Sequence, residues 1–155
     1  GVSMAKGLCF GYGIPLIAVS TLKIIASKAI SLNNKTNETL YCAMLDARRM
    51  EVYASIFDKE LTTCRETAAD IVTPETYEDF LNKGPVCFFG NGAEKCKTVI
   101  THPNAMFIDD IYPLAEDMAL LAEEAFTKGE FKDVAYFEPF YLKDFVATVA
   151  RNKVL

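Results

Sequence analysis

Residues 39–57 read TLYCAMLDARRMEVYASIF, and this stretch decides how the rest of the chain can fold. Residues 39–45 predict one strand. Residues 51–57 predict a second, because Val52, Ala54 and Ile56 alternate with polar or amphipathic neighbours. The D-A-R-R-M segment between the two strands fits a turn, so the stretch predicts an antiparallel hairpin.

Residues 63–72 predict a third, irregular strand after the hairpin. A helix is then expected, with Thr73 as N-cap, Pro74 at the first helical position and Gly84 just past its end. Residues 86–89 form a short apolar run that predicts a buried strand.

The segment Gly90-Asn91-Gly92 breaks this strand and leads into a short helix through about residue 99. Residues 105–108 predict one more strand, and Pro113 begins what we expect to be the longest helix, stopped by Gly129. Four apolar residues line one face of that helix: Leu114, Met118, Leu121 and Ala125.

From residue 39 the predicted order is strand, strand, strand, helix, strand, helix, strand, helix. A meander that continues into right-handed crossovers makes an α/β fold, a mixed five-stranded sheet with helices on both faces. This is the ribonuclease-H-like arrangement, which nucleases share with the actin-like ATPase superfamily. Element order alone does not choose between them.

The leading part predicts a helix at residues 2–12, a buried strand at 14–19, and a helix capped by Ser20. Residues 33–38 are polar without periodicity and fit a linker. Three small residues recur every four positions in the first helix: Ser3, Gly7 and Gly11. Either another helix approaches closely along this row, or Gly7 packs on the protein's own sheet and Gly11 ends the helix.

The composition describes a globular chain: 155 residues, 51% hydrophobic and 24% charged, with a net charge of −5. This acidic balance disfavours direct binding of nucleic acid by the chain alone. The longest apolar stretch, residues 13–19, is far shorter than the ~20 residues of a membrane span, so no membrane is expected. Five scattered cysteines indicate reduced thiols in the cytoplasm, and a single histidine, His102, leaves no zinc site.

Two kinds of chemistry are open from the residues alone. A metal-dependent nuclease would use Asp46, Glu78 or Asp79, and Asp109-Asp110 with magnesium or manganese, although each carboxylate also suits a turn or an exposed helix face.

A nucleotide-binding lobe would be centred on Gly90, Asn91, Gly92 and Ala93, between a strand and a helix. A tight turn explains the glycines equally, and Lys95 stands where the dinucleotide fingerprint needs its third glycine.

Four blocks together resemble the TsaB (YeaZ) family and span nearly the whole chain. They are the glycine-rich helix, strand and V-S-T-L stretch at residues 1–22, the D-A-R-x-x-E-V-Y hairpin at 46–53, the glycine turn at 90–93, and the closing P-x-Y-L-R segment at 139–143. Six residues carry the hairpin and closing motifs, with a lysine in place of the usual final arginine: Asp46, Arg48, Glu51, Tyr53, Tyr141 and Lys143.

The resemblance implies a non-catalytic member of the actin-like ATPase superfamily. Such a subunit pairs with a TsaD-like catalytic subunit and, with a TsaE-like ATPase, helps attach threonylcarbamoyl to an adenosine of transfer RNA. It also implies that ATP and Mg²⁺ are used by the partner, that tRNA is reached only indirectly, and that a homodimer can form. An older family label, M22 glycoprotease, conflicts with a single histidine.

In this family the first helix belongs to a leading lobe and builds the subunit interface, which implies interface residues Ser3, Met4, Gly7, Leu8 and Gly11. A G-P-G-S-F-T-G loop and the first strands of that lobe should precede Gly1. We therefore expect residues 1–32 to be a remnant of the first lobe, residues 39–130 the second lobe, and residues 131–155 a segment that docks back on the first. An unpaired strand at 14–19 also predicts an oligomer or a covering contact.

Overall fold

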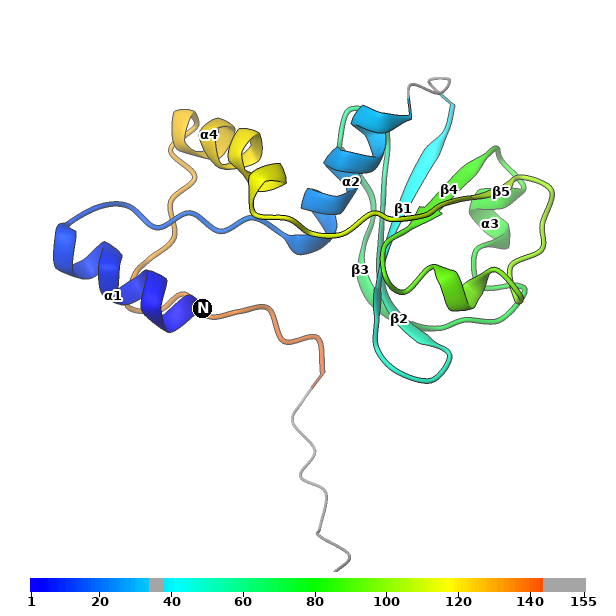
Figure 1. Ribbon diagram of the computed structural model, residues 1–155, viewed down its shortest axis with the longest axis horizontal. Coiled ribbons are helices and arrows are strands. Elements are labelled where there is room, and N and C mark those ends of the chain that lie inside the picture. Colours follow the sequence, from blue (N-terminus) through cyan, green and yellow to red (C-terminus); the bar gives the residue numbers. More distant parts are fainter. Residues whose placement is uncertain (34–37, 144–155) are drawn as a thin grey trace, which may run out of the picture.

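A computed structural model describes residues 1–33 and 38–143 (Figure 1), so most of the predicted linker at 33–38 and the end of the chain lie outside the described residues. The hairpin prediction is confirmed. Strand β1 (Leu40–Asp46) pairs antiparallel with β2 (Glu51–Phe57), from Tyr41 opposite Phe57 to Asp46 opposite Val52. Strand β3 (Thr63–Ile71) continues the meander on the other side of β2, with a register irregularity around Ile56.

Two parallel strands complete the sheet. Strand β4 (Val86–Phe89) pairs with β1, and β5 (Ala105–Ile108) pairs with β4, which gives the order β3-β2-β1-β4-β5. The order confirms the predicted mixed five-stranded, ribonuclease-H-like α/β sheet. Strands β1 and β4 end at the same edge, so the glycine turn that follows β4 lies against the last residues of β1, Met44 to Asp46.

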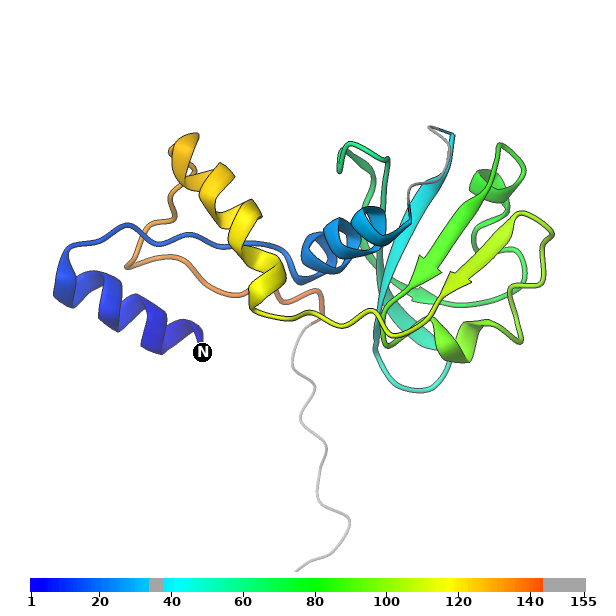
Figure 2. The same cartoon turned by 45° about the horizontal axis from the view of Figure 1, so that its top comes forward.

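Helices cover both faces of the sheet, as Figures 1 and 2 show. Helix α2 (Thr21–Leu32) packs on one face, and α3 (Glu78–Leu81) with the 3-10 turn Glu94–Cys96 packs on the other. Alternate residues of β1 face opposite cores, Tyr41 and Ala43 towards α2 and Cys42 and Met44 towards α3. Both cores are closed, because all four of these residues have no exposed surface.

The helix predicted to start after Thr73 is mostly a series of turns, and its helical part is only the four residues of α3. The Thr73 amide donates to Thr76 Oγ1 at 2.8 Å, and Thr76 N donates back to the Thr73 carbonyl at 3.2 Å. These two hydrogen bonds pair polar groups of Thr73 and Thr76 within a turn, so this part of the chain needs no α-helix. Tyr77 then binds Asp70 Oδ2 at 2.8 Å in the core, which fixes the chain direction before α3 begins.

The helix expected from Pro113 is also shorter than predicted. A 3-10 turn (Glu116–Met118) precedes α4 (Ala119–Thr127), and its nine residues make it shorter than α2 with twelve. Asp117 pairs with Lys28 of α2 at 2.7 Å, which holds the 3-10 turn against that helix. The predicted apolar face is only half buried: Leu121 and Ala125 are buried, whereas Leu114 is 48% exposed.

The run at residues 14–19 is not the buried strand that its composition predicts. Leu16 makes one isolated antiparallel bridge, to Lys132, and Ile14 is 52% exposed. A strand buried on both faces needs a ladder of neighbours. Among the described residues only this one bridge is available, so the backbone stays extended without a sheet.

Helix α1 (Val2–Tyr12) has the predicted bounds and lies with α4 to one side of the sheet, where residues 131–143 also run (Figure 1). The Lys6 ammonium donates to the carbonyl oxygens of Ala135 at 3.0 Å and Phe137 at 2.8 Å. Two contacts therefore join the closing segment to the leading part, this one and the Leu16–Lys132 bridge. In the described part of the chain, no helix is long and apolar enough to cross a membrane.

Candidate partner interface and strand-end site

One face of α1 is open to solvent. All five residues that the sequence predicted for the interface are exposed: Ser3, Met4, Gly7, Leu8 and Gly11. Met4 is 71% exposed, Leu8 is 47% exposed, and the neighbouring Phe10 and Tyr12 are more exposed still. The opposite side of the helix faces the protein, with Cys9 buried. A helix in water does not normally expose so many large apolar side chains.

The row of small residues on α1 does not serve the protein's own packing. A methyl group built on Gly7 or on Gly11 meets no other heavy atom within 4 Å. The helix continues past Gly11 and is ended by Gly13, at φ 63°, so the alternative in which Gly7 packs on the sheet and Gly11 ends the helix is wrong. The row remains open to another molecule.

The glycine turn after β4 packs tightly on the end of β1. A Cβ on Gly90, at φ +97°, would lie 2.3 Å from the Met44 carbonyl oxygen, and one on Gly92 would lie 2.9 Å from the carbonyl carbon of Leu45. The Gly92 amide donates to Met44 O at 3.2 Å, and Asn91 Oδ1 accepts from the Asp46 amide at 3.0 Å. Close backbone approach therefore accounts for both glycines without a ligand.

Lys95 was not predicted as a site residue, yet it organises the hairpin turn. Its ammonium pairs with the Asp46 carboxylate and donates to the carbonyl oxygens of Arg49 at 2.8 Å and Glu51 at 2.7 Å. The hydrogen bond from Lys95 holds the pKa of Asp46 below its ordinary value. No local pattern marks this lysine, because its partners lie more than forty residues away.

Two of the family-motif blocks meet beside the turn of the same hairpin. Lys143, in the closing segment, forms an ion pair with Glu51 at the start of β2. Tyr53 is half-buried two residues further along β2, and Tyr141 is 76% exposed. The structure thus gives Glu51 and Lys143 a shared role in tying the closing segment to the sheet.

The carboxylates proposed for a metal-dependent nuclease do not converge. Asp46 pairs with Lys95, and Asp109 pairs with Lys97 at 2.6 Å, a hydrogen bond that raises the pKa of Lys97. Glu78 and Asp79 are exposed on α3. Within residues 1–33 and 38–143, no three His, Cys, Asp or Glu side chains are placed to hold a metal ion. The nuclease hypothesis therefore lacks its site.

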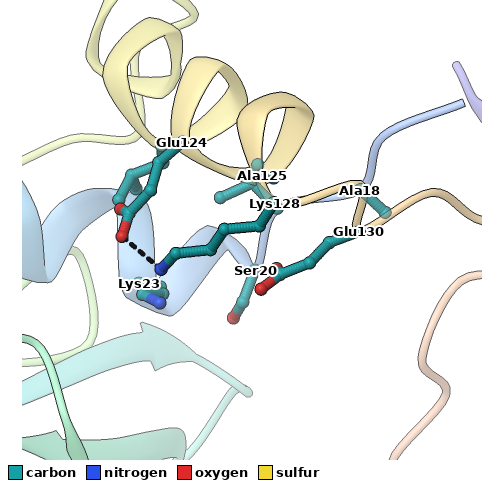
Figure 3. Close-up of a pocket in the computed structure, with 9 residues that line it drawn as sticks. Ala18, Ser20, Lys23, Glu124, Ala125, Lys128 and Glu130 are labelled. Atoms are coloured by element: carbon teal, nitrogen blue, oxygen red, sulfur yellow. Dashed lines mark hydrogen bonds and ion pairs between the residues drawn. The ribbon is translucent and has the colours of Figure 1, made fainter.

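Two of the hollows on the described part of the surface adjoin the elements discussed above. One, of about 110 Å³, lies between α2 and α4, where Lys128 and Glu124 pair beside Lys23 and Ser20 (Figure 3). The other, of about 300 Å³, lies beside the glycine turn. The charged residues that line it are acidic, and the first two of them pair with Lys97: Glu94, Asp109 and Asp110.

The comparisons with known proteins agree with the motif blocks. The family described as "TsaD: tRNA N6-adenosine threonylcarbamoyltransferase" matches residues 1–155. The chain is also 30% identical over 154 residues to the tRNA threonylcarbamoyladenosine biosynthesis protein TsaB of Escherichia coli (strain K12). This chain belongs to the TsaB (YeaZ) family.

Solved structures of the TsaB (YeaZ) family share the fold. YeaZ from Pseudomonas aeruginosa matches 91% of this chain at a TM-score of 0.69 and 25% identity. A crystal structure titled as an uncharacterized protein with similarity to peptidase YEAZ, from the same organism, matches 92% at a TM-score of 0.73 and 26% identity. The matched part of this chain covers 65% of the length of each of these proteins and of the Escherichia coli protein.

Proposed function

We propose that this chain is a supporting subunit for the synthesis of threonylcarbamoyladenosine in tRNA, in the cytoplasm, and that it binds a TsaD-like catalytic subunit without bond chemistry of its own. Its similarity to TsaB supports the pathway. The observation that carries the subunit role is the open face of α1, where large apolar side chains stand beside a row of small residues that nothing in the described chain covers.

The open face has the properties of a helix–helix contact. Gly7 and Gly11 leave the backbone bare, so that a partner helix can approach closely between Met4 and Leu8. Each Å² of apolar surface that such a contact removes from water contributes roughly 25 cal/mol. Because interior glycine costs a helix about 1 kcal/mol against alanine, a close contact also explains why two glycines are kept here.

The paired carboxylates support a role without catalysis. Asp46 and Asp109, the best-placed acids at the carboxyl edge of the sheet, are each neutralised by a lysine. We accordingly assign ATP and Mg²⁺ to the partner subunit and to a TsaE-like ATPase, and no cofactor to this chain. The single histidine, His102, argues against the older glycoprotease label, since zinc proteases bind the metal with two or more such ligands.

We also propose a division of labour along the chain. Residues 1–32 belong to a first lobe that carries the interface, residues 39–130 form the second lobe, and residues 131–155 return to the first. The Lys6 bonds to the closing segment and the Leu16–Lys132 bridge support this return. A homodimer through α1 would use the same face and so compete with the catalytic partner.

The test replaces Gly7 with leucine and, as a matched control, with alanine. Both variants raise helix propensity by up to about 1 kcal/mol, and a Cβ atom at this position meets no heavy atom within 4 Å. Only leucine is large enough to hold a partner helix away. We expect Gly7→Leu to abolish co-purification with the TsaD-like subunit and Gly7→Ala to keep it. If Gly7→Leu associates as wild type does, with partner and with itself, the interface on α1 is refuted.

A further inference from the structure

The β1–β2 turn holds two successive arginines in a backbone conformation that side chains disfavour. Arg48 has φ 70° and Arg49 has φ 48°, both in the left-handed region. Asparagine and glycine are the residues that hairpin turns of this kind normally use, because L side chains are strained there. Strain that persists at a loop tip points to a use for the side chains involved.

The rest of the protein keeps this strained turn in place. Lys95 donates to two of its carbonyl groups, and the Asp46 carboxylate accepts from the Arg48 amide at 3.2 Å. On the far side the Val72 amide donates to the Met50 carbonyl at 2.8 Å. The turn is therefore rigid before any partner arrives, which lowers the entropy lost on binding.

The charges at the tip are only partly compensated, because Arg48 acts electrostatically on the Asp46 carboxylate, whose ion-pair partner is Lys95. The carboxylates on either side of the tip, Asp46 and Glu51, already pair with Lys95 and Lys143. Arg48 and Arg49 are exposed, and among the described residues neither guanidinium has a carboxylate partner within salt-bridge distance. A chain of net charge −5 thus presents a local positive tip.

The closing segment carries exposed aromatic rings and is tied by its end to the start of β2. The ion pair between Lys143 and Glu51 links the end of the closing segment, drawn in orange in Figures 1 and 2, to the first residue of β2, directly after the turn. Phe140 is 79% exposed and Tyr141 is 76% exposed, three and two residues before Lys143. Guanidinium forks bind phosphate, and open aromatic rings stack on unpaired bases.

We propose that the hairpin tip, Arg48 and Arg49, together with the exposed Phe140 and Tyr141 of the closing segment, is a contact site for the phosphates and unstacked bases of RNA. The identity of the ligand rests on the proposed function, whose substrate is a tRNA. The site departs from the expectation, based on net charge, that direct binding of nucleic acid is disfavoured, and from the implication of the family resemblance that tRNA is reached only indirectly. Net charge averages over the whole chain, whereas phosphates respond to the charges within a Debye length of about 10 Å.

The test variant is Arg48→Asn/Arg49→Gly, which removes both charges and gives the turn the residues it prefers. Its control, Lys83→Gln/Lys132→Gln, removes two charges from exposed lysines elsewhere. A fluorescent, unmodified tRNA transcript is titrated against the complex with the TsaD-like subunit and against the chain alone, at several salt concentrations. Urea unfolding and co-purification are measured for the same proteins.

We expect the arginine variant to bind the transcript roughly tenfold more weakly near 0.1 M salt, with the slope of log K against log salt reduced by about 1.5 for two lost phosphate contacts. Its urea midpoint stays the same or rises, and the lysine control binds as wild type. Phe140→Ala/Tyr141→Ala also weakens binding but keeps the salt slope, because stacking releases no counterions.

An unchanged affinity and slope in the arginine variant would overturn the RNA contact. The proposal would also be overturned if the arginine variant no longer co-purified with the TsaD-like subunit but still bound the transcript as wild type does. The tip would then recognise an acidic protein surface. If wild type fails to bind the TsaD-like subunit at all, the proposed function fails separately, and the titration of the chain alone still decides the role of the tip.

Discussion

Replacing Gly90 with alanine should be among the most destabilising single changes in this protein, although it adds one methyl group. Gly90 ends β4 at φ +97°, and the new Cβ would lie 2.3 Å from the carbonyl oxygen of Met44 and 2.9 Å from Ile25 Cδ1. The Met44 carbonyl belongs to the central strand and accepts the Gly92 amide, so it has no room to retreat. Strain and overlap therefore act together.

The magnitude follows from these two effects. A left-handed backbone costs an L-residue roughly 1–2 kcal/mol. Overpacking by one methyl group in a dense interior costs about 1–3 kcal/mol, and a backbone obstacle puts Gly90 at the upper end. The sum, about 3–5 kcal/mol, is a large part of the 5–15 kcal/mol that stabilises a typical domain.

Urea unfolding followed by circular dichroism measures this loss, with Gly129→Ala as the matched control. Gly129 also has a positive φ, +69°, but a Cβ there meets nothing within 4 Å. The control should lose only the backbone cost of roughly 1–2 kcal/mol. With a slope near 2 kcal/mol per M, Gly90→Ala should lower the midpoint by about 1.5–2.5 M.

The reasoning is refuted if the two variants lose equal stability. Equal losses would mean that the close approach of Gly90 to β1 carries no energetic weight, and the glycine would then need another explanation, such as a ligand that approaches the turn. Binding of ATP or ADP to wild type, abolished in Gly90→Ala, would be the corresponding positive result.

Two further predictions concern buried and clamped carboxylates. Asp70, 8% exposed, accepts two bonds from Arg65 and one from Tyr77. Asp70→Asn should therefore cost about 3 kcal/mol in urea unfolding, because it leaves the Arg65 charge without its partner, and a loss below about 1 kcal/mol would contradict this. Lys95→Met should return the pKa of Asp46 towards its ordinary value of about 3.9. Because the folded pKa is the lower one, wild type has an added stability above pH 3.9 that is lost as the pH falls through the folded pKa. NMR titration of Asp46 in wild type and in Lys95→Met measures this pKa. If the two proteins give the same pKa for Asp46, the prediction is wrong.

The sequence anticipated which face of α1 is open to solvent better than it anticipated the strand-end site. The spacing of Ser3, Gly7 and Gly11 marked one helix face, and that face is the exposed one. Lys95 and the Glu51–Lys143 pair were not anticipated as contacts, because an ion pair across forty or ninety residues leaves no local pattern. The nuclease carboxylates failed for the same reason: their lysine partners come from other segments.

Local periodicity determined the hairpin, the order of the sheet and helix α1, since alternation and helical spacing are properties of neighbouring residues. The same local patterns gave wrong predictions in three places. Residues 14–19 have the composition of a buried strand but only one isolated bridge, and the helices expected at 73–84 and 113–129 are shorter because turns replace their first residues. Only the tertiary structure decided that the glycine turn packs on β1 and that the arginine tip is clamped and unpaired. Those outcomes depend on contacts between distant segments, and distance along the chain carries no information about distance in space until the sheet has formed.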